Sequence, residues 1–180
     1  MGGDERLRLF LGLPLPDEPR RRLAEWAGRA FGDADGVRVV SPENLHVTLV
    51  FLGGRPAGEV DAIVGELRAA AGAVKPPVLE PVRYRETRSV GMVVLSDEDG
   101  RATALASDLS GRLERLGVYR PEQRPWLPHV TVARFRRPPR LRPDLPALGP
   151  VSPSEAALYT SLLRRTGAQY EIQESVSLGG

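Results

Sequence analysis

The chain contains only two histidines, and both stand in the same local sequence. The first begins His46-Val47-Thr48-Leu49 and the second begins His129-Val130-Thr131-Val132. Threonine supplies 6 of the 180 residues, so finding it two places after both histidines by chance has odds of roughly one in a thousand. Imidazole is the side chain that titrates nearest neutral pH. The duplication therefore predicts a site that uses two histidines for acid–base chemistry.

Strand geometry gives this duplication a structural meaning. β-rich sequence surrounds each motif, and residues i and i+2 of a strand point to the same face. His46 then projects with Thr48, and His129 projects with Thr131. If the two strands lie side by side around a pseudo-twofold axis, the four polar groups converge. One imidazole can act as general base and the other as general acid in a displacement at phosphorus, with the hydroxyls holding the non-bridging oxygens.

Other kinds of site fit the sequence less well. A single buried histidine in a strand is more often structural than catalytic. The chain has no cysteine, which excludes disulfides, thiolate zinc sites and a cysteine nucleophile. Two histidines without an H-x-H spacing make a poor ligand set, so we expect no metal and no cofactor. Neither a G-x-S-x-G elbow nor a phosphate-binding G-x-x-x-x-G-K-[ST] loop occurs.

The composition is that of an ordinary globular domain. The 180 residues are 41% hydrophobic and 27% charged with a net charge of +2, which suits one domain spanning residues 1–180. Lys75 is the only lysine among the 25 basic residues. Arginine suits phosphate binding, but a G+C-rich genome explains the bias better. The apolar run at 9–13 ends at Pro14, too early for a signal peptide, and we expect a cytoplasmic protein with no membrane contact.

Hydrophobic periodicity predicts three helices and about eight strands, with hairpins as well as crossovers, which indicates an α+β fold. The helices are expected over 17–31, over 56–71, and from a cap within 96–99 to residue 116. The strands are expected over 6–13, 37–40, 45–52, 78–86, 90–95, 129–135, 155–163 and 170–178. Proline-rich segments 121–128 and 136–153 are predicted loops. Four arginines of the second loop could contact nucleic acid, although a solvated loop is the more economical interpretation.

These motifs and their flanks resemble the two-histidine phosphoesterase superfamily, and more narrowly the bacterial RNA 2′,3′-cyclic phosphodiesterases, historically called 2′-5′ RNA ligases. The superfamily's signature is two copies of H-x-T-x with apolar x. The resemblance is carried by Arg6–Phe10 with Leu13-Pro14, by Pro42–Gly53, by Arg124–Arg134, and by Leu158–Ser161 followed by Gly167, Tyr170 and Leu178.

The resemblance implies a fold, a reaction and a role for each histidine. The fold is bilobal and pseudo-twofold symmetric, with two antiparallel sheets and outer helices around a central V-shaped cleft. The reaction opens an RNA 2′,3′-cyclic phosphate end to a 2′-phosphate and uses no metal. Related enzymes also join RNA halves reversibly through a 2′-5′ linkage, by the same displacement with a 5′-hydroxyl in place of water. His46 is then the proton donor to the departing 3′-oxygen, and His129 is the proton acceptor that activates water. The reverse assignment is chemically allowed.

Three further residues are candidates for substrate binding. By the resemblance, Arg134 contacts phosphate. Strict alternation puts it on the face opposite His129, so it reaches the cleft only if the strand ends or bulges near Ala133; a surface ion pair is the alternative. Phe10 and Phe51 could stack on a base. An aromatic residue at a strand end is nevertheless usually part of the core.

Two rival functions remain at this point. Another member of the superfamily could cleave a small cyclic nucleotide, an ADP-ribose cyclic phosphate or a 2′-5′ oligonucleotide. An RNA-binding module could keep the cleft without turnover. The expected partner is an RNA with a 2′,3′-cyclic phosphate end, and the protein is expected to act as a monomer.

Overall fold

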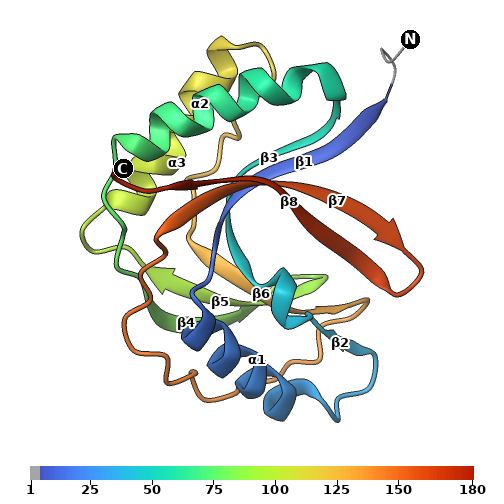
Figure 1. Ribbon diagram of the computed structural model, residues 1–180. Helices are drawn as coiled ribbons and strands as arrows, with labels where there is room; N and C mark the ends of the chain where they lie inside the picture. The colour runs from blue at the N-terminus through green and yellow to red at the C-terminus, as the bar shows by residue number, and fades with distance from the viewer. Residues whose placement is uncertain (1–4) are drawn as a thin grey trace.

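The computed structural model describes residues 5–180 and has the predicted α+β architecture (Figure 1). All three expected helices and all eight expected strands are present, but the third strand runs four residues past its expected end, to Pro56, and the second helix begins at Val60 instead of Pro56. The helices are α1 (Asp17–Phe31), α2 (Val60–Gly72) and α3 (Arg101–Arg115). The strands are β1 (Arg6–Pro14), β2 (Val37–Val39), β3 (His46–Pro56), β4 (Glu80–Glu86), β5 (Val90–Ser96), β6 (His129–Phe135), β7 (Glu155–Arg164) and β8 (Gly167–Ser177).

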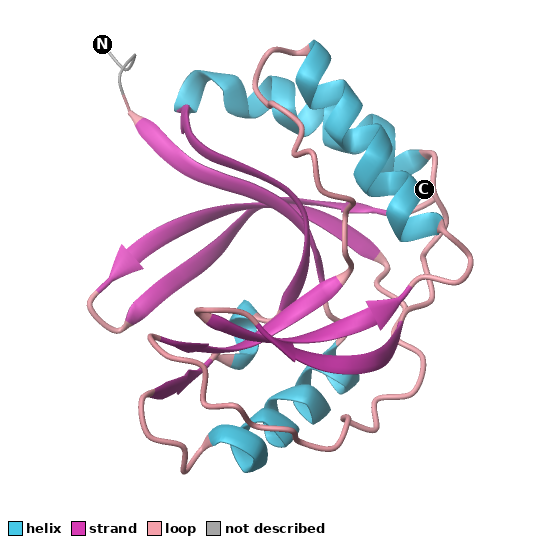
Figure 2. Ribbon diagram, turned by 180° about the vertical axis from the view of Figure 1, so that it is seen from behind, coloured by secondary structure: helices cyan, strands magenta, loops and turns pink. Residues whose placement is uncertain are grey.

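The strands form one strongly bent antiparallel sheet. Its order is β4-β5-β6-β3-β1-β7-β8, and β2 pairs separately with β6. The two sheets expected from the sequence are the two halves of this one sheet. One half ends with β6 and the other with β3, and the halves diverge from the place where these two strands meet (Figures 1 and 2). Only one residue pair, Val47 with Val130, joins β3 to β6 among the residues described. The halves are therefore continuous at the centre and open outward from it.

Helices cover the outer face of each half of the sheet. α2 and α3 lie together over the half that contains β1, β3, β7 and β8, whereas α1 lies over the half that contains β6 (Figures 1 and 2). Leu105, Leu109 and Leu113 show the pattern for α3, because residues four apart share one face of a helix and all three are fully buried. No helix within residues 5–180 is long and apolar enough to cross a membrane.

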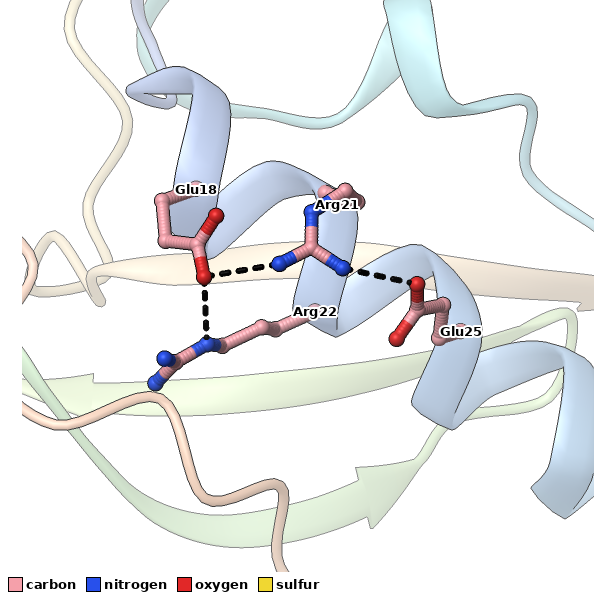
Figure 3. A network of polar contacts seen from close by, with 4 residues as sticks. All are labelled: Glu18, Arg21, Arg22 and Glu25. Carbon is pink, nitrogen blue, oxygen red and sulfur yellow. Dashed lines mark hydrogen bonds and ion pairs between the residues drawn. The ribbon is translucent and has the colours of Figure 1, made fainter.

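Many arginines of α1 are neutralised within the helix. Glu18 accepts hydrogen bonds from Arg21 (2.7 Å) and Arg22 (2.9 Å), and Arg21 also donates to Glu25 at 2.9 Å (Figure 3). These are i,i+3 and i,i+4 pairs on the solvent side, and each adds little stability. Pairing of this kind leaves few arginines of α1 available to bind an anion.

Gly12 of β1 lies where a side chain would not fit. A Cβ atom there would be 2.8 Å from the Val47 carbonyl oxygen and 3.2 Å from Cδ2 of His46. The backbone of β1 therefore approaches β3 closely at this point. Gly12 thus leaves the space beside the imidazole of His46 that a side chain would fill.

We expect Gly12→Ala to lower the free energy of unfolding by about 1–3 kcal/mol, because the added methyl group must displace the backbone of β3. Gly65→Ala is the matched control, since Gly65 lies in α2 with nothing within 4 Å of the new atom. That variant should gain roughly 0.5–1 kcal/mol from helix propensity. Urea unfolding measures both, and equal effects of the same sign would contradict the packing argument.

Candidate active site

The two His-Val-Thr motifs meet at the centre of the sheet. Val47 and Val130 are the middle residues of the two motifs, and they pair with each other across β3 and β6. Because the strands are antiparallel, His46 and Thr131 lie on one side of this pair and Thr48 and His129 on the other. The valine side chains are buried, so the histidines and threonines face away from the core.

A cleft of about 360 Å³ opens over this centre. All seven side chains selected from the sequence line it: Phe10, His46, Thr48, Phe51, His129, Thr131 and Arg134. The first and last of these seven residues, Phe10 and Arg134, are 124 positions apart in the sequence.

Both histidines are held in the same way by the backbone. Nδ1 of His46 donates to the carbonyl oxygen of Asn44 at 2.7 Å, and Nδ1 of His129 donates to that of Leu127 at 2.8 Å. A carbonyl oxygen can only accept, so each Nδ1 carries a proton. Nε2 of each ring is then the atom that can take up or release a proton. In His46 this atom lies 2.9 Å from Oγ1 of Thr48.

The electrostatic environment of His46 favours the neutral imidazole. Burial lowers its pKa to about 4, and repulsion from His129 and Arg134 acts in the same direction. The hydrogen bond to Asn44 opposes this shift without cancelling it. The uncharged ring therefore predominates at neutral pH while the cleft is empty.

Arg134 reaches the cleft because β6 bulges. Gly91 pairs with Ala133 and Met92 with Thr131, so the intervening Val132 is an extra residue without a partner on β5. A bulge of this kind reverses the alternation of the residues that follow it. Arg134 is consequently exposed on the side of His129, whereas strict alternation places it on the opposite face.

Phe51 reaches the cleft by an equivalent bulge in β3. Leu11 pairs with Val50 and Gly12 with Thr48, so Leu49 is the extra residue. Leu49 follows its histidine by three positions, as Val132 does, and Phe51 follows by five, as Arg134 does. The Phe51 side chain is 46% exposed. The guanidinium carbon of Arg8 lies 4.9 Å from the centre of its ring.

Phe10 lies at the edge of the cleft but is almost wholly buried, which favours the core position over stacking on a base, the other alternative that the sequence left open. Only 3% of its surface is exposed, because three aromatic rings surround it. It stacks on Tyr159 with ring centres 4.6 Å apart, and its ring centre lies 4.8 Å from that of His46. The edge of Tyr170 covers it further. Phe10 therefore supports the imidazole of His46 from the core side.

Tyr170 is a cleft residue that sequence reasoning placed only in a strand. Its hydroxyl oxygen accepts a hydrogen bond from Nη2 of Arg134 at 3.3 Å. Its ring meets that of His46 edge-on, with centres 5.4 Å apart. The sequence placed Tyr170 at the start of the strand expected over 170–178 and among the residues of the resemblance, and neither observation indicated that Arg134 lies beside it.

Asn44 and Trp126 connect the motifs to the rest of the structure. Nδ2 of Asn44 donates to the carbonyl oxygen of Ala168 at 3.0 Å, which ties the start of β3 to β8. Nε1 of Trp126 donates to the carbonyl oxygen of Thr48 at 3.0 Å, which ties the segment before the second motif to the first motif.

Within residues 5–180, no cluster of three or more His, Cys, Asp or Glu side chains is placed to hold a metal.

Comparisons with known proteins agree on one group of phosphoesterases. Residues 13–83 match the model of the family described as LigT like Phosphoesterase. An RNA 2′,3′-cyclic phosphodiesterase of Thermus thermophilus is 33% identical over 97% of this chain and 91% of its own. The crystal structure of TT0787 of Thermus thermophilus superposes with a TM-score of 0.82 at 30% identity, covering 97% of this chain and 99% of that one. The apo crystal structure of Escherichia coli LigT gives 0.77 at 26% identity, covering 98% and 100%.

The depressed pKa of His46 predicts a loss of stability in acid. Below its ordinary pKa of 6.5 the unfolded chain binds a proton at this residue, whereas the folded chain binds it only below about 4. The free energy of unfolding should therefore fall by about 3 kcal/mol from this group between pH 7 and 4. Urea unfolding of His46→Gln should lack that part of the decrease, and His129→Gln should retain it. Parallel pH profiles for the wild type and His46→Gln would contradict the assignment.

Proposed function

Because the chain belongs to the family of LigT-like phosphoesterases, we propose that it hydrolyses the 2′,3′-cyclic phosphate ends of RNA to 2′-phosphates. The observation that carries this proposal is the convergence of two equivalent His–Thr pairs on one cleft, around the pairing of β3 with β6. The name of the Thermus thermophilus relative supplies the substrate class. Residues 1–180 act in this proposal as one catalytic domain.

The two imidazoles divide the proton transfers. Nε2 of His129 takes a proton from water, whose oxygen forms a bond to phosphorus in line with the 3′-oxygen. The bond from phosphorus to the 3′-oxygen breaks, and Nε2 of His46 donates a proton to that oxygen. The product is a 2′-phosphate beside a free 3′-hydroxyl. Each histidine then returns to its starting state by exchanging a proton with solvent.

Thr48, Thr131 and Arg134 serve the phosphate itself. The hydroxyls donate to the non-bridging oxygens, and the guanidinium compensates the charge that develops on them in the transition state. Tyr170 accepts from Nη2 of Arg134. This contact leaves the remaining N–H groups of Arg134 for the phosphate.

The low pKa of His46 makes its proton part of substrate binding. In the empty cleft the ring is neutral at pH 7, chiefly because it is buried and also because it lies near His129 and Arg134. The negative charge of the cyclic phosphate compensates that repulsion and raises the pKa of His46. A proton is therefore taken up together with the substrate. Once bound, it lies on an acid strong enough to release it readily to the leaving oxygen.

The same displacement at phosphorus can use a different nucleophile. A 5′-hydroxyl of a second RNA in place of water would attack the cyclic phosphate and form a 2′-5′ linkage. Both reactions pass through the same pentacoordinate phosphorus, so one set of side chains serves both. Hydrolysis should predominate because water is present in great excess.

The first test is turnover of an RNA oligonucleotide with a 2′,3′-cyclic phosphate end in the presence of EDTA. The wild type should convert the cyclic end to a 2′-phosphate. His46→Ala and His129→Ala should each lose about 10²–10⁴-fold in kcat, because each removes one proton transfer. Product identity is read from phosphorus NMR, and thermal unfolding checks that the variants fold.

Other outcomes of this test identify the rival functions. Binding by all three proteins without turnover would indicate an RNA-binding module. Turnover of a cyclic mononucleotide or a 2′-5′ dinucleotide, but not of the RNA end, would indicate another substrate of the superfamily. Inhibition by EDTA would overturn the two-histidine mechanism.

A second test separates the donor from the acceptor. When sulfur replaces the 3′-oxygen of the cyclic phosphate, the leaving thiolate needs no proton. His46→Ala should therefore recover most of its lost rate on this substrate, relative to wild type, whereas His129→Ala should not. Recovery by His129→Ala alone would reverse the two roles and leave the reaction unchanged.

A further inference from the structure

Equivalent positions in the two halves of the cleft carry different chemistry. Five residues after the second histidine stands Arg134, a cation; five residues after the first stands Phe51, an aromatic ring. Bulges at Val132 and Leu49 turn both side chains toward the cleft. The first half nevertheless has a cation at this place, because Arg8 of the neighbouring strand β1 lies over the ring of Phe51.

Among the residues that the structure describes, Arg8 differs from most arginines near it in having no polar partner. Its side chain is exposed and makes no hydrogen bond or ion pair with any residue from 5 to 180. Arg6, two positions earlier on the same strand, donates to the carbonyl oxygen of Gly54 at 2.7 Å. Arg55 pairs with Glu59 through two hydrogen bonds. Only Arg8 among these three lines the cleft.

Stacking on an aromatic ring prepares a guanidinium to bind an anion. The ring attracts the cation through its face and limits the motion of the long side chain. The N–H groups lie in the guanidinium plane, so they stay free to donate to two oxygens of one phosphate. Phe51 is thus a positioning residue for Arg8.

The place of Arg8 along β1 relates it to the reacting group. Arg8 and Phe10 share a face of the strand and are about 7 Å apart along it, at 3.3–3.4 Å per residue. Phe10 packs against the ring of His46. Arg8 therefore lines the cleft about 7 Å farther along β1 than the residue that packs on His46, a spacing of about one nucleotide of RNA backbone.

We propose that Arg8, held by Phe51, binds the phosphodiester on the 5′ side of the terminal nucleotide. This subsite rests on the proposed function, since it takes the cyclic phosphate at the histidines as its reference point. It makes the enzyme selective for the ends of RNA chains over cyclic mononucleotides. The phosphate at the histidines and the phosphate at Arg8 are then bound by separate cations, Arg134 and Arg8.

The test compares four substrates that share one reacting group. They are a nucleoside 2′,3′-cyclic phosphate with a 5′-hydroxyl, the same with a 5′-phosphate, a dinucleotide with a terminal cyclic phosphate, and that dinucleotide with a neutral methylphosphonate linkage. The wild type should prefer the charged dinucleotide over its methylphosphonate by roughly tenfold in kcat/KM, as expected for one charged hydrogen-bonded contact. A similar preference for the 5′-phosphate over the 5′-hydroxyl would show that a terminal phosphate also occupies the subsite.

Arg8→Gln should abolish this preference, lowering the kcat/KM ratio of the charged to the neutral dinucleotide by about tenfold. Phe51→Leu should lower the same ratio by a smaller factor than Arg8→Gln does. Phe51→Tyr keeps an aromatic ring and should therefore leave the ratio close to that of the wild type. Arg6→Gln is the matched control and should leave the ratio at the wild-type value. Thermal unfolding checks that each variant folds.

Two results would overturn the subsite. One is an unchanged ratio in Arg8→Gln; the other is an equal loss on all four substrates, which would place Arg8 at the reacting phosphate. If the wild type turns over none of the substrates, the proposed function fails and the subsite is tested by binding. In that case calorimetry with a dinucleotide ending in a 2′-phosphate, and with its methylphosphonate form, should show the same tenfold ratio and its loss in Arg8→Gln.

Discussion

The antiparallel pair between Val47 and Val130 is the contact on which the cleft depends. Each valine is the middle residue of its motif, and both side chains are buried in the core. Alternation along a strand then directs the flanking histidine and threonine of each motif to the open face. Because β3 and β6 are joined at this single pair within the residues described, the two halves of the sheet can diverge from it. The cleft widens outward while the four polar groups stay together at its floor.

The backbone relates the two motifs by symmetry, but the side chains around them do not. Both histidines donate through Nδ1 to a carbonyl oxygen two residues earlier. His46 is in addition packed among the rings of Phe10, Tyr159 and Tyr170. That burial lowers its pKa to about 4. In the proposed mechanism the bound phosphate must therefore raise the pKa of His46 before this ring can donate its proton.

Local sequence predicted the elements well and the orientation of some side chains poorly. The helix expected over 17–31 has those bounds as α1, because its apolar spacing and flanking prolines are local signals. The bulges at Leu49 and Val132 have no such signal, since both residues also suit a regular strand. Without the bulges, alternation turns Phe51 and Arg134 away from the cleft. The burial of Phe10 likewise depends on Tyr159 of β7 and Tyr170 of β8, which follow it by 149 and 160 positions in the sequence.

Under the proposed function, a cleft with twofold symmetry must accept an RNA strand that has none. The cyclic phosphate can lie near the axis, where both histidines reach it, but the rest of the nucleotide must extend toward one half only. The two positions five residues after the histidines differ in the way this requires. In this proposal Arg134, which donates a hydrogen bond to Tyr170, brings its charge to the phosphate at the centre. Phe51 instead lies under the guanidinium of Arg8, which comes from the neighbouring strand β1. If Arg8 binds as proposed, the direction of the bound strand is set by which half carries the outer cation, whereas the symmetric backbone alone leaves it undetermined.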